Sequence, residues 1–161
     1  YDAADQVVGV RFDNIQIPEG STLYRAYIQF EAKATDSNLD PTNLIINGEL
    51  SSASTTFSAV NNDISSRPLT SSAVNWSAIN TWNLIGEAEL FQRTPYLTTI
   101  VNEIITQNDW ATGNALTFIF SGEGRRIATS LDGGVAPLLK LFYQLPCLDA
   151  GTVCDDGDPS N

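Results

Sequence analysis

One stretch of strict alternation constrains the fold of this chain more than any other feature. From Ala26 to Ala34 every even position carries an apolar residue, and every odd position carries a polar or amphipathic one. Successive side chains of a β-strand point to opposite faces, so this period of two predicts one buried face and one solvated face. The stretch therefore predicts a half-buried antiparallel strand, which we extend to about residues 22–35.

The rest of the chain shows the same pattern of short strands. Turn signals such as Pro18-Glu19-Gly20 and Asp132-Gly133-Gly134 separate the apolar or alternating runs. About eight or nine strands are expected, and no strand–helix–strand alternation indicates a parallel sheet. Besides the strand at 22–35, strands are predicted over residues 6–12, 43–50, 73–77, 81–85, 115–121, 125–131 and 137–144.

Two segments depart from the strand pattern. Thr94 is a suitable N-cap, Pro95 suits a first helical position, and the apolar residues that follow have helical spacing as far as Asp109 to Gly113. They predict one helix. Residues 51–73 are rich in Ser, Thr and Asn with little periodicity, but their scattered apolar residues favour an ordered excursion over the sheet rather than a linker.

Together these elements predict an all-β fold, an antiparallel jelly-roll-like β-sandwich with one short α-helix. A chain of 161 residues fits one domain, and we assign the sandwich to residues 1–145. Residues 146–161 lack apolar periodicity and are interpreted as a Cys/Asp-rich tail or linker. Outside a cell, Cys147 and Cys154 would close a small disulfide loop; two free thiols are the alternative.

The composition argues against several classes of function. The chain contains no histidine, which removes histidine-activated nucleophiles and most zinc sites. Its formal net charge of −11 opposes binding to nucleic acids and anionic membranes. No apolar run reaches the roughly 18 residues that a membrane span needs. Because the chain also lacks methionine, we expect a mature form or an excised piece, and the composition is typical of an extracellular β protein.

The acidic residues leave calcium as the metal to consider. Closely spaced aspartates provide the oxygen ligands that this hard cation requires. One candidate stretch is the loop at residues 36–40, and the other is formed by Asp155, Asp156 and Asp158 in the tail. A solvated acidic run is the alternative in both places, and neither stretch matches an EF-hand loop.

A series of short motifs runs in a recognisable order between residues 6 and 144. In chain order they are Val8-Gly9-Val10-Arg11-Phe12, Ile17-Pro18-Glu19-Gly20-Ser21, Ala26-Tyr27-Ile28-Gln29-Phe30, Ile64-Ser65-Ser66-Arg67-Pro68, Val74-Asn75-Trp76, Gln92-Arg93-Thr94-Pro95, Trp110-Ala111-Thr112-Gly113-Asn114-Ala115-Leu116, Arg126-Ile127-Ala128 and Pro137-Leu138-Leu139. As a set they resemble the DNRLRE-type domains, secreted bacterial β-sandwiches of which some are carbohydrate-binding modules on polysaccharide lyases and hydrolases.

The chain differs from the DNRLRE-type domains at its start, and its tail shows a second resemblance. Related domains usually begin with another acidic strand or two, whereas only residues 1–5 precede the first motif here. If those strands carry a calcium site in the relatives, that site is in doubt in this chain. The tail at 151–159 is similar to Cys- and Asp-rich spacers of large secreted marine bacterial proteins.

Aromatic and arginine side chains are the candidates for carbohydrate binding. Sugar rings stack on aromatic faces, so we select Trp82, which lies in a polar neighbourhood, and Trp110; core packing is the alternative for both. Arg11, Arg93 and Arg126 would form a positive patch that pairs with uronate carboxylates or sulfates. Ion pairs with the many acidic residues of the chain are the alternative for the arginines.

The sequence therefore favours a non-catalytic carbohydrate-binding module of a larger secreted bacterial protein, with polysaccharide as its partner. The competing hypothesis is a structural or adhesive building block of an extracellular filament or surface assembly, with neighbouring domains or identical subunits as partners. An enzyme is not expected, because the acids nearest to a candidate pair, Glu87, Glu89 and Glu103, show no sign of converging.

Overall fold

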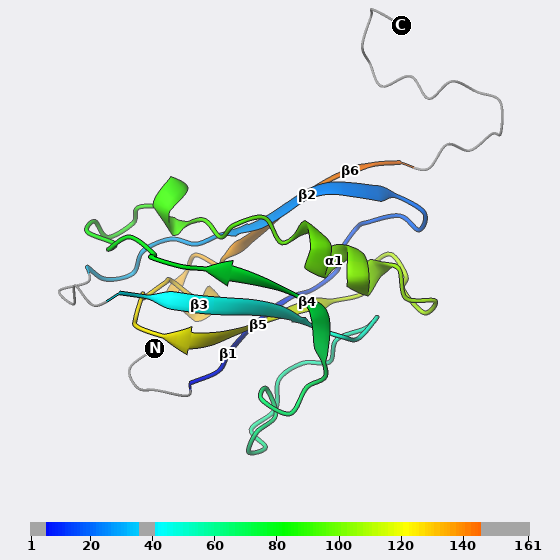
Figure 1. Cartoon of the computed structure of the whole chain (residues 1–161), viewed down its shortest axis with the longest axis horizontal. Coiled ribbons are helices and arrows are strands. Elements are labelled where there is room, and N and C mark those ends of the chain that lie inside the picture. Colours follow the sequence, from blue (N-terminus) through cyan, green and yellow to red (C-terminus); the bar gives the residue numbers. More distant parts are fainter. Residues whose placement is uncertain (1–5, 36–40, 146–161) are drawn as a thin grey trace, which may run out of the picture.

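The computed structural model describes residues 6–35 and 41–145, and within them it shows six strands in two antiparallel sheets and one short α-helix (Figure 1). The predicted all-β, sandwich-like class is confirmed. The elements in chain order are β1 (Val8–Phe12), β2 (Thr22–Gln29), β3 (Asn43–Glu49), β4 (Leu69–Trp76), the 3₁₀-helix η1 (Leu90–Gln92), α1 (Thr98–Ile105), β5 (Leu116–Glu123), the 3₁₀-helix η2 (Leu131–Gly133) and β6 (Leu138–Gln144).

The larger sheet has the strand order β1-β5-β3-β4. Residues opposite each other in an antiparallel pair share a face, and the pairs Phe12–Leu116, Ile46–Phe120 and Leu44–Trp76 place the apolar residues of all four strands on one side. This inner face carries much of the hydrophobic core.

The smaller sheet consists of β2 and β6, and a third segment runs along the free edge of β2. Backbone bonds join Leu97 N–H to Ala26 O at 2.8 Å, Thr94 N–H to Ile28 O at 3.0 Å and Phe30 N–H to Gln92 O at 2.9 Å. The segment at 86–98 is therefore a partner of β2, although it contains only one isolated bridge, at Arg93, and no strand. The even positions that alternate in the sequence face the core, where Ala26 and Ile28 are fully buried.

Helix α1 packs against β2, β3 and β4 (Figure 1). Its buried residues, Ile100, Val101 and Ile104, face the core. Gly48 of β3 makes this close approach possible, because a Cβ atom there would lie 2.7 Å from Cγ2 of Ile100. The helix closes the side of the sandwich formed by β4 and the start of β2.

The excursion predicted over residues 51–73 is confirmed for residues 51–68, drawn in teal in Figure 1, whereas residues 69–73 belong to strand β4. A Cβ atom at Gly9 would lie 2.6 Å from Cζ of Phe57 and 3.2 Å from Cγ2 of Ile64. Ile119, on the outer face of β5, is consequently only 4% exposed. The excursion therefore covers the outer face of β1 and β5, whereas Ile45 of β3 and Asn75 of β4, on the same outer face, remain exposed.

The predicted helix limits were wrong. The helix begins at Thr98 with Leu97 as its N-cap and ends at Ile105. Thr94 instead bonds to β2 through its backbone N–H and through its hydroxyl, which accepts from Ile28 N–H at 3.0 Å. Pairing with the free edge of β2 thus replaces the first helical turn that the sequence favoured.

The strand count was also too high. Residues 81–85 are not a strand, and the strand expected at 125–131 is reduced to an isolated bridge between Ala32 and Ala128. Lys33 N–H still donates to Ile127 O at 2.9 Å, and Thr129 N–H to Glu31 O at 2.9 Å. Residues 127–129 therefore extend the smaller sheet without enough pairs to form a strand of their own.

Candidate functional site

The outer face of the smaller sheet carries a cluster of aromatic and basic residues. The β2–β6 register pairs Arg25 with Phe142 and Tyr27 with Lys140. Because directly opposed residues share a face, these four side chains lie on the side opposite the core. A register shift between Leu23 and Arg25 lets both Tyr24 and Arg25 remain exposed at the start of β2.

The segment along the other edge of β2 adds two side chains to the same face. Arg93 forms an isolated bridge with Gln29, and its guanidinium carbon lies 4.9 Å from the centroid of the Tyr27 ring. Tyr96 lies 6.4 Å, centroid to centroid, from Tyr27. We call this surface the aromatic–arginine face; it consists of Tyr24, Arg25, Tyr27, Arg93, Tyr96 and Phe142.

The rings and guanidinium groups of this face hold one another in position. Arg25 lies over Tyr96 at 5.4 Å and over Phe142 at 5.5 Å, measured to the ring centroids. Tyr27 stacks on Phe142 at 6.2 Å with 25° between the ring planes. Such cation–π and aromatic contacts contribute about 0.5–1 kcal/mol each at exposed sites. They order the face while leaving Tyr24 63% and Tyr96 53% exposed.

The face is a positive patch on an acidic chain. Among the described residues, neither Arg25 nor Arg93 nor the adjacent Lys140 forms an ion pair with a carboxylate. Their N–H groups remain available to an external acceptor. A bidentate bond from arginine to a carboxylate or sulfate, beside a flat aromatic surface, is the chemistry that this arrangement offers.

Arg93 is the predicted binding residue that lies in this face; the two predicted tryptophans do not. Trp82 is only 2% exposed, and its indole Nε1–H donates to Phe91 O at 3.2 Å. Trp110 is 5% exposed. Neither indole presents a ring face to solvent, so the structure assigns both to the core rather than to a stacking surface.

Arg11 and Arg126 are bonded within the chain. Arg11 donates to Ser54 O through Nε at 3.1 Å and through Nη2 at 2.9 Å, and it forms an ion pair with Asp13. Arg126 donates to Asn80 O at 2.7 Å and also to Ile79 O. Both arginines thus fix loops in place, and neither contacts the rings of the aromatic–arginine face.

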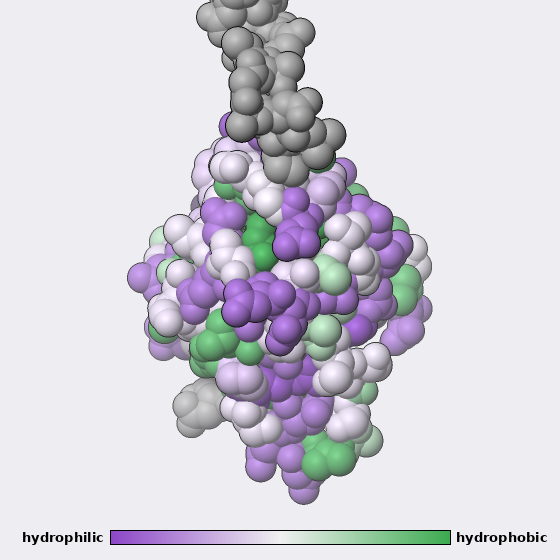
Figure 2. All heavy atoms as spheres, turned by 90° about the vertical axis from the view of Figure 1, so that its right-hand side faces the viewer, coloured by the Kyte–Doolittle hydropathy of each residue, from purple (hydrophilic) through white to green (hydrophobic). Residues whose placement is uncertain are grey.

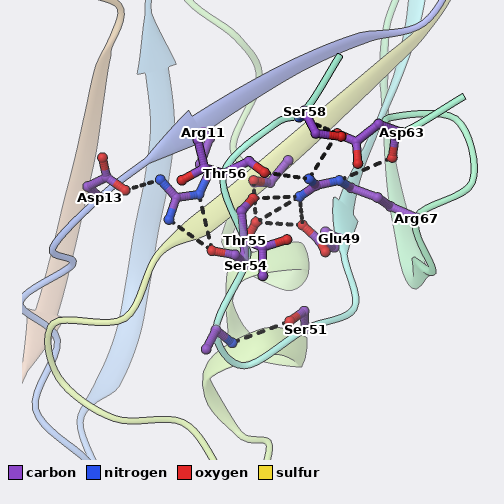
Figure 3. A network of polar contacts seen from close by, with 12 residues as sticks. Arg11, Asp13, Glu49, Ser51, Ser54, Thr55, Thr56, Ser58, Asp63 and Arg67 are labelled. Atoms are coloured by element: carbon purple, nitrogen blue, oxygen red, sulfur yellow. Dashed lines mark hydrogen bonds and ion pairs between the residues drawn. The ribbon is translucent and has the colours of Figure 1, made fainter. Parts of the chain in front are cut away.

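Arg67 is the centre of a buried polar network beneath the excursion, on the outer face of the larger sheet (Figure 3). Its Nη1 lies 2.8 Å from Oε2 of Glu49, and the two side chains are 6% and 8% exposed. The guanidinium also donates to Thr55 O at 2.9 Å and lies 4.8 Å from the Phe57 ring centroid. These contacts tie the excursion to the end of β3.

The network shifts two pKa values. Burial alone would lower the pKa of Arg67, but the hydrogen bond and charge of Glu49, together with those of Asp63, outweigh it and raise that pKa. The pKa of Asp63 is lowered, mainly because its carboxylate accepts the backbone N–H of Ser58. Both shifts favour the charged forms, so the network is a structural support and not a source of protons near neutral pH.

The calcium and disulfide predictions lie outside the described residues. Asp155, Asp156, Asp158, Cys147 and Cys154 all belong to this part, as does the loop at 36–40. Within residues 6–35 and 41–145, no group of three His, Cys, Asp or Glu residues could hold a metal ion. No helix in those ranges has the length and apolar character to cross a bilayer.

Comparisons with protein-family models, with curated proteins and with solved structures found no match for this chain. The resemblance to DNRLRE-type domains therefore stays a prediction that rests on the sequence motifs.

Most of the aromatic–arginine face was missed by sequence reasoning, although part of it had a signal. Tyr27 occupies an odd position of the alternating strand, whose odd positions face solvent. Lys140 and Phe142 show the same period of two in β6. An exposed aromatic at such a position is a candidate for binding, but Tyr96 comes from an irregular segment and has no comparable signal.

Proposed function

We propose that this domain is a non-catalytic polysaccharide-binding module whose binding surface is the aromatic–arginine face. A polysaccharide lies across the smaller sheet, with a sugar ring against Tyr27 or Tyr96. Arg25 and Arg93 donate hydrogen bonds to its carboxylate or sulfate groups. The mechanism is adhesion to a preformed surface, which raises the local concentration of a linked domain near its substrate.

One observation carries this proposal: two arginines without carboxylate partners among the described residues lie over tyrosine and phenylalanine rings on an exposed sheet face. An arginine that stabilises the interior of a protein normally forms an ion pair with a carboxylate, as Arg67 does with Glu49. A flat, ordered and cationic surface is instead suited to an anionic ligand with apolar ring faces. The sequence motifs resemble secreted bacterial domains of which some are carbohydrate-binding modules. On this basis we also propose that the domain is part of a larger secreted bacterial protein.

The test measures binding of the chain to acidic polysaccharides (alginate, polygalacturonate and chondroitin sulfate) and to neutral xylan, by affinity electrophoresis and calorimetry. We expect the Tyr27→Ala variant and the double variant R25A/R93A each to bind at least about tenfold more weakly than the unsubstituted chain, which corresponds to about 1.4 kcal/mol. The arginine variant should lose affinity for acidic chains only.

Two control variants separate local contacts from general effects. Lys33→Ala also removes one positive charge, but Lys33 is not part of the aromatic–arginine face, and Asn75→Ala changes an exposed residue of β4 in the other sheet. Both should bind as the unsubstituted chain does. Absence of binding to every acidic polysaccharide, or unchanged affinity in both face variants, would refute the proposal.

A second candidate function is a building block of an extracellular assembly. Within the described residues β1 pairs only with β5, and β6 only with β2, so each sheet has an edge strand open to further pairing. The inward residues Val10, Leu139 and Leu141 on these strands are only partly buried. Light scattering over a concentration series tests this candidate, since strand addition by identical subunits would give dimers or longer chains.

A further inference from the structure

The two arginines of the aromatic–arginine face are attached at separate places along the smaller sheet. Arg93 forms its bridge with Gln29, which lies at the far end of β2 from Arg25. A strand rises about 3.3 Å per residue, so the backbone positions of the two arginines differ by about 13 Å along β2. The face therefore presents positive charge at two levels of the strand rather than at one point.

The two guanidinium groups also end over different rings. The guanidinium carbon of Arg93 lies 4.9 Å from the Tyr27 ring centroid. That of Arg25 lies 5.4 Å from the centroid of Tyr96 and 5.5 Å from that of Phe142. Because each guanidinium is held by its own rings, each can bind a carboxylate or sulfate of its own.

Tyrosine rings connect the two cations. Tyr27 is partly buried, with Arg93 on the side of the 86–98 segment and Phe142 on the side of β6. Tyr96 lies 6.4 Å from Tyr27, centroid to centroid, and is 53% exposed. Of these two tyrosines, Tyr96 thus offers the larger apolar surface to a sugar ring, whereas Tyr27 mainly holds Arg93 in position.

The surface changes beyond Arg25, towards the start of β2. Figure 2 looks onto the end of the molecule where β2 begins and β6 ends, and hydrophobic residues appear there as separate groups within a mostly hydrophilic surface. The charged residue that precedes Arg25 in the chain is Glu19, which is exposed in the turn before β2. A polyanion that continues in this direction meets a like charge and gains little.

We propose that the aromatic–arginine face contains two anion subsites, one at Arg25 and one at Arg93, which two acidic groups of the same polysaccharide occupy together. A sugar between these groups lies against Tyr96. The inference rests on the function proposed above and defines its ligand more closely, as a densely charged acidic segment and not a single acidic sugar. Binding at one subsite holds the chain beside the other, so the second contact forms at a high effective concentration.

The test titrates the ¹⁵N-labelled chain with oligogalacturonates of increasing length, from the single uronate to chains longer than the face, and follows the backbone signals by NMR. The affinity should rise at least about tenfold at the length where a second carboxylate reaches the second arginine, and only slowly beyond it. R25A and R93A should each lose this step but still bind the short oligomers that the remaining arginine holds. Lys33→Ala, which changes a cation outside the face, should keep the step.

A matched pair of variants tests the surface between the subsites. Tyr96→Phe keeps the ring and should bind long oligomers as the unsubstituted chain does, whereas Tyr96→Ala should bind them more weakly. If no acidic saccharide of any length binds, the proposed function is wrong, and the two subsites with it. If long chains bind but the affinity grows smoothly with length, or the step persists in R25A or R93A, the polysaccharide surface stands and the two subsites are wrong.

Discussion

The arginines of this chain differ in function because of what lies within reach of each guanidinium. Arg67 is enclosed by Glu49, Asp63 and backbone carbonyls, so its charge is neutralised inside the fold. Among the residues that the structure describes, the guanidinium groups of Arg25 and Arg93 contact aromatic rings and form no ion pair. The same residue type therefore serves as internal support in one place and as an open donor in another.

Loss of Arg67 should destabilise the fold strongly. The R67M variant leaves the Glu49 carboxylate buried without its cation, and breaking a buried pair in this way costs about 3–5 kcal/mol. The double variant R67M/E49Q removes both charges and should recover part of this loss. Urea denaturation measures the free energy of unfolding, with R25A as the exposed control, where less than about 1 kcal/mol is expected. Equal losses in R67M and R25A would contradict the assignment.

At the scale of the elements, helix α1 packs in the core and also binds the backbone of strand β4 through Glu103. The Glu103 carboxylate accepts the backbone N–H of Ser71 at 2.6 Å and that of Ser72 at 2.8 Å, both from the edge strand β4. These bonds satisfy donors that an edge strand would otherwise expose to another chain. They also lower the pKa of Glu103, with the Ser72 bond as the largest cause.

This lowered pKa predicts a pH-dependent contribution to stability. A carboxyl group whose pKa is lower in the folded state stabilises the fold above its unfolded pKa, near 4.5 for glutamate, and loses this effect as the pH falls through the folded value. Glu103→Gln should therefore be less stable than the unsubstituted chain at pH 7, and the difference should shrink at pH 3.

Urea midpoints at the two pH values measure this difference. Glu19→Gln is the control, since Glu19 is exposed and has no hydrogen bond or ion pair within the described residues. A gap between Glu103→Gln and the unsubstituted chain that is the same at both pH values would show that the carboxylate charge is not involved.

At the scale of the whole molecule, the chain combines a net charge of −11 with one cationic face. A polyanion is repelled by the body of the protein at long range and attracted by Arg25, Arg93 and Lys140 at contact. Near 0.1 M salt the Debye length is about 10 Å, so the distant acids are largely screened while the contacts persist. The local patch can therefore bind an acidic chain despite the net charge.

This balance predicts a salt dependence. Raising the salt concentration from about 0.1 M to about 1 M shortens the Debye length to about 3 Å, and affinity for an acidic polysaccharide should fall at least about tenfold. Binding of a neutral polysaccharide should hardly change, and R25A/R93A should show a flatter salt profile. Calorimetry at several salt concentrations measures this, and a flat profile for the unsubstituted chain would rule out the arginines as ligand contacts.

The class of fold could be predicted from the sequence, because the information lies in local periodicity. The alternating residues from Ala26 onward impose one buried face, and frequent turn residues keep the strands short. The excursion, predicted over residues 51–73 and found over residues 51–68, was also foreseen, since its few apolar residues need a surface to pack on. The absence of histidine, likewise visible in the sequence, determines which chemistries are unavailable.

The binding face was decided by tertiary structure. Its side chains come from three separate parts of the chain, at 24–27, at 93–96 and at Phe142, which the pairing of β2 with two different partners brings together. Local patterns do not specify which strands become neighbours, nor which arginine finds a carboxylate. The same limitation explains why the start of the helix was predicted wrongly. The residues around Thr94 pair with the free edge of β2 instead of forming the first helical turn.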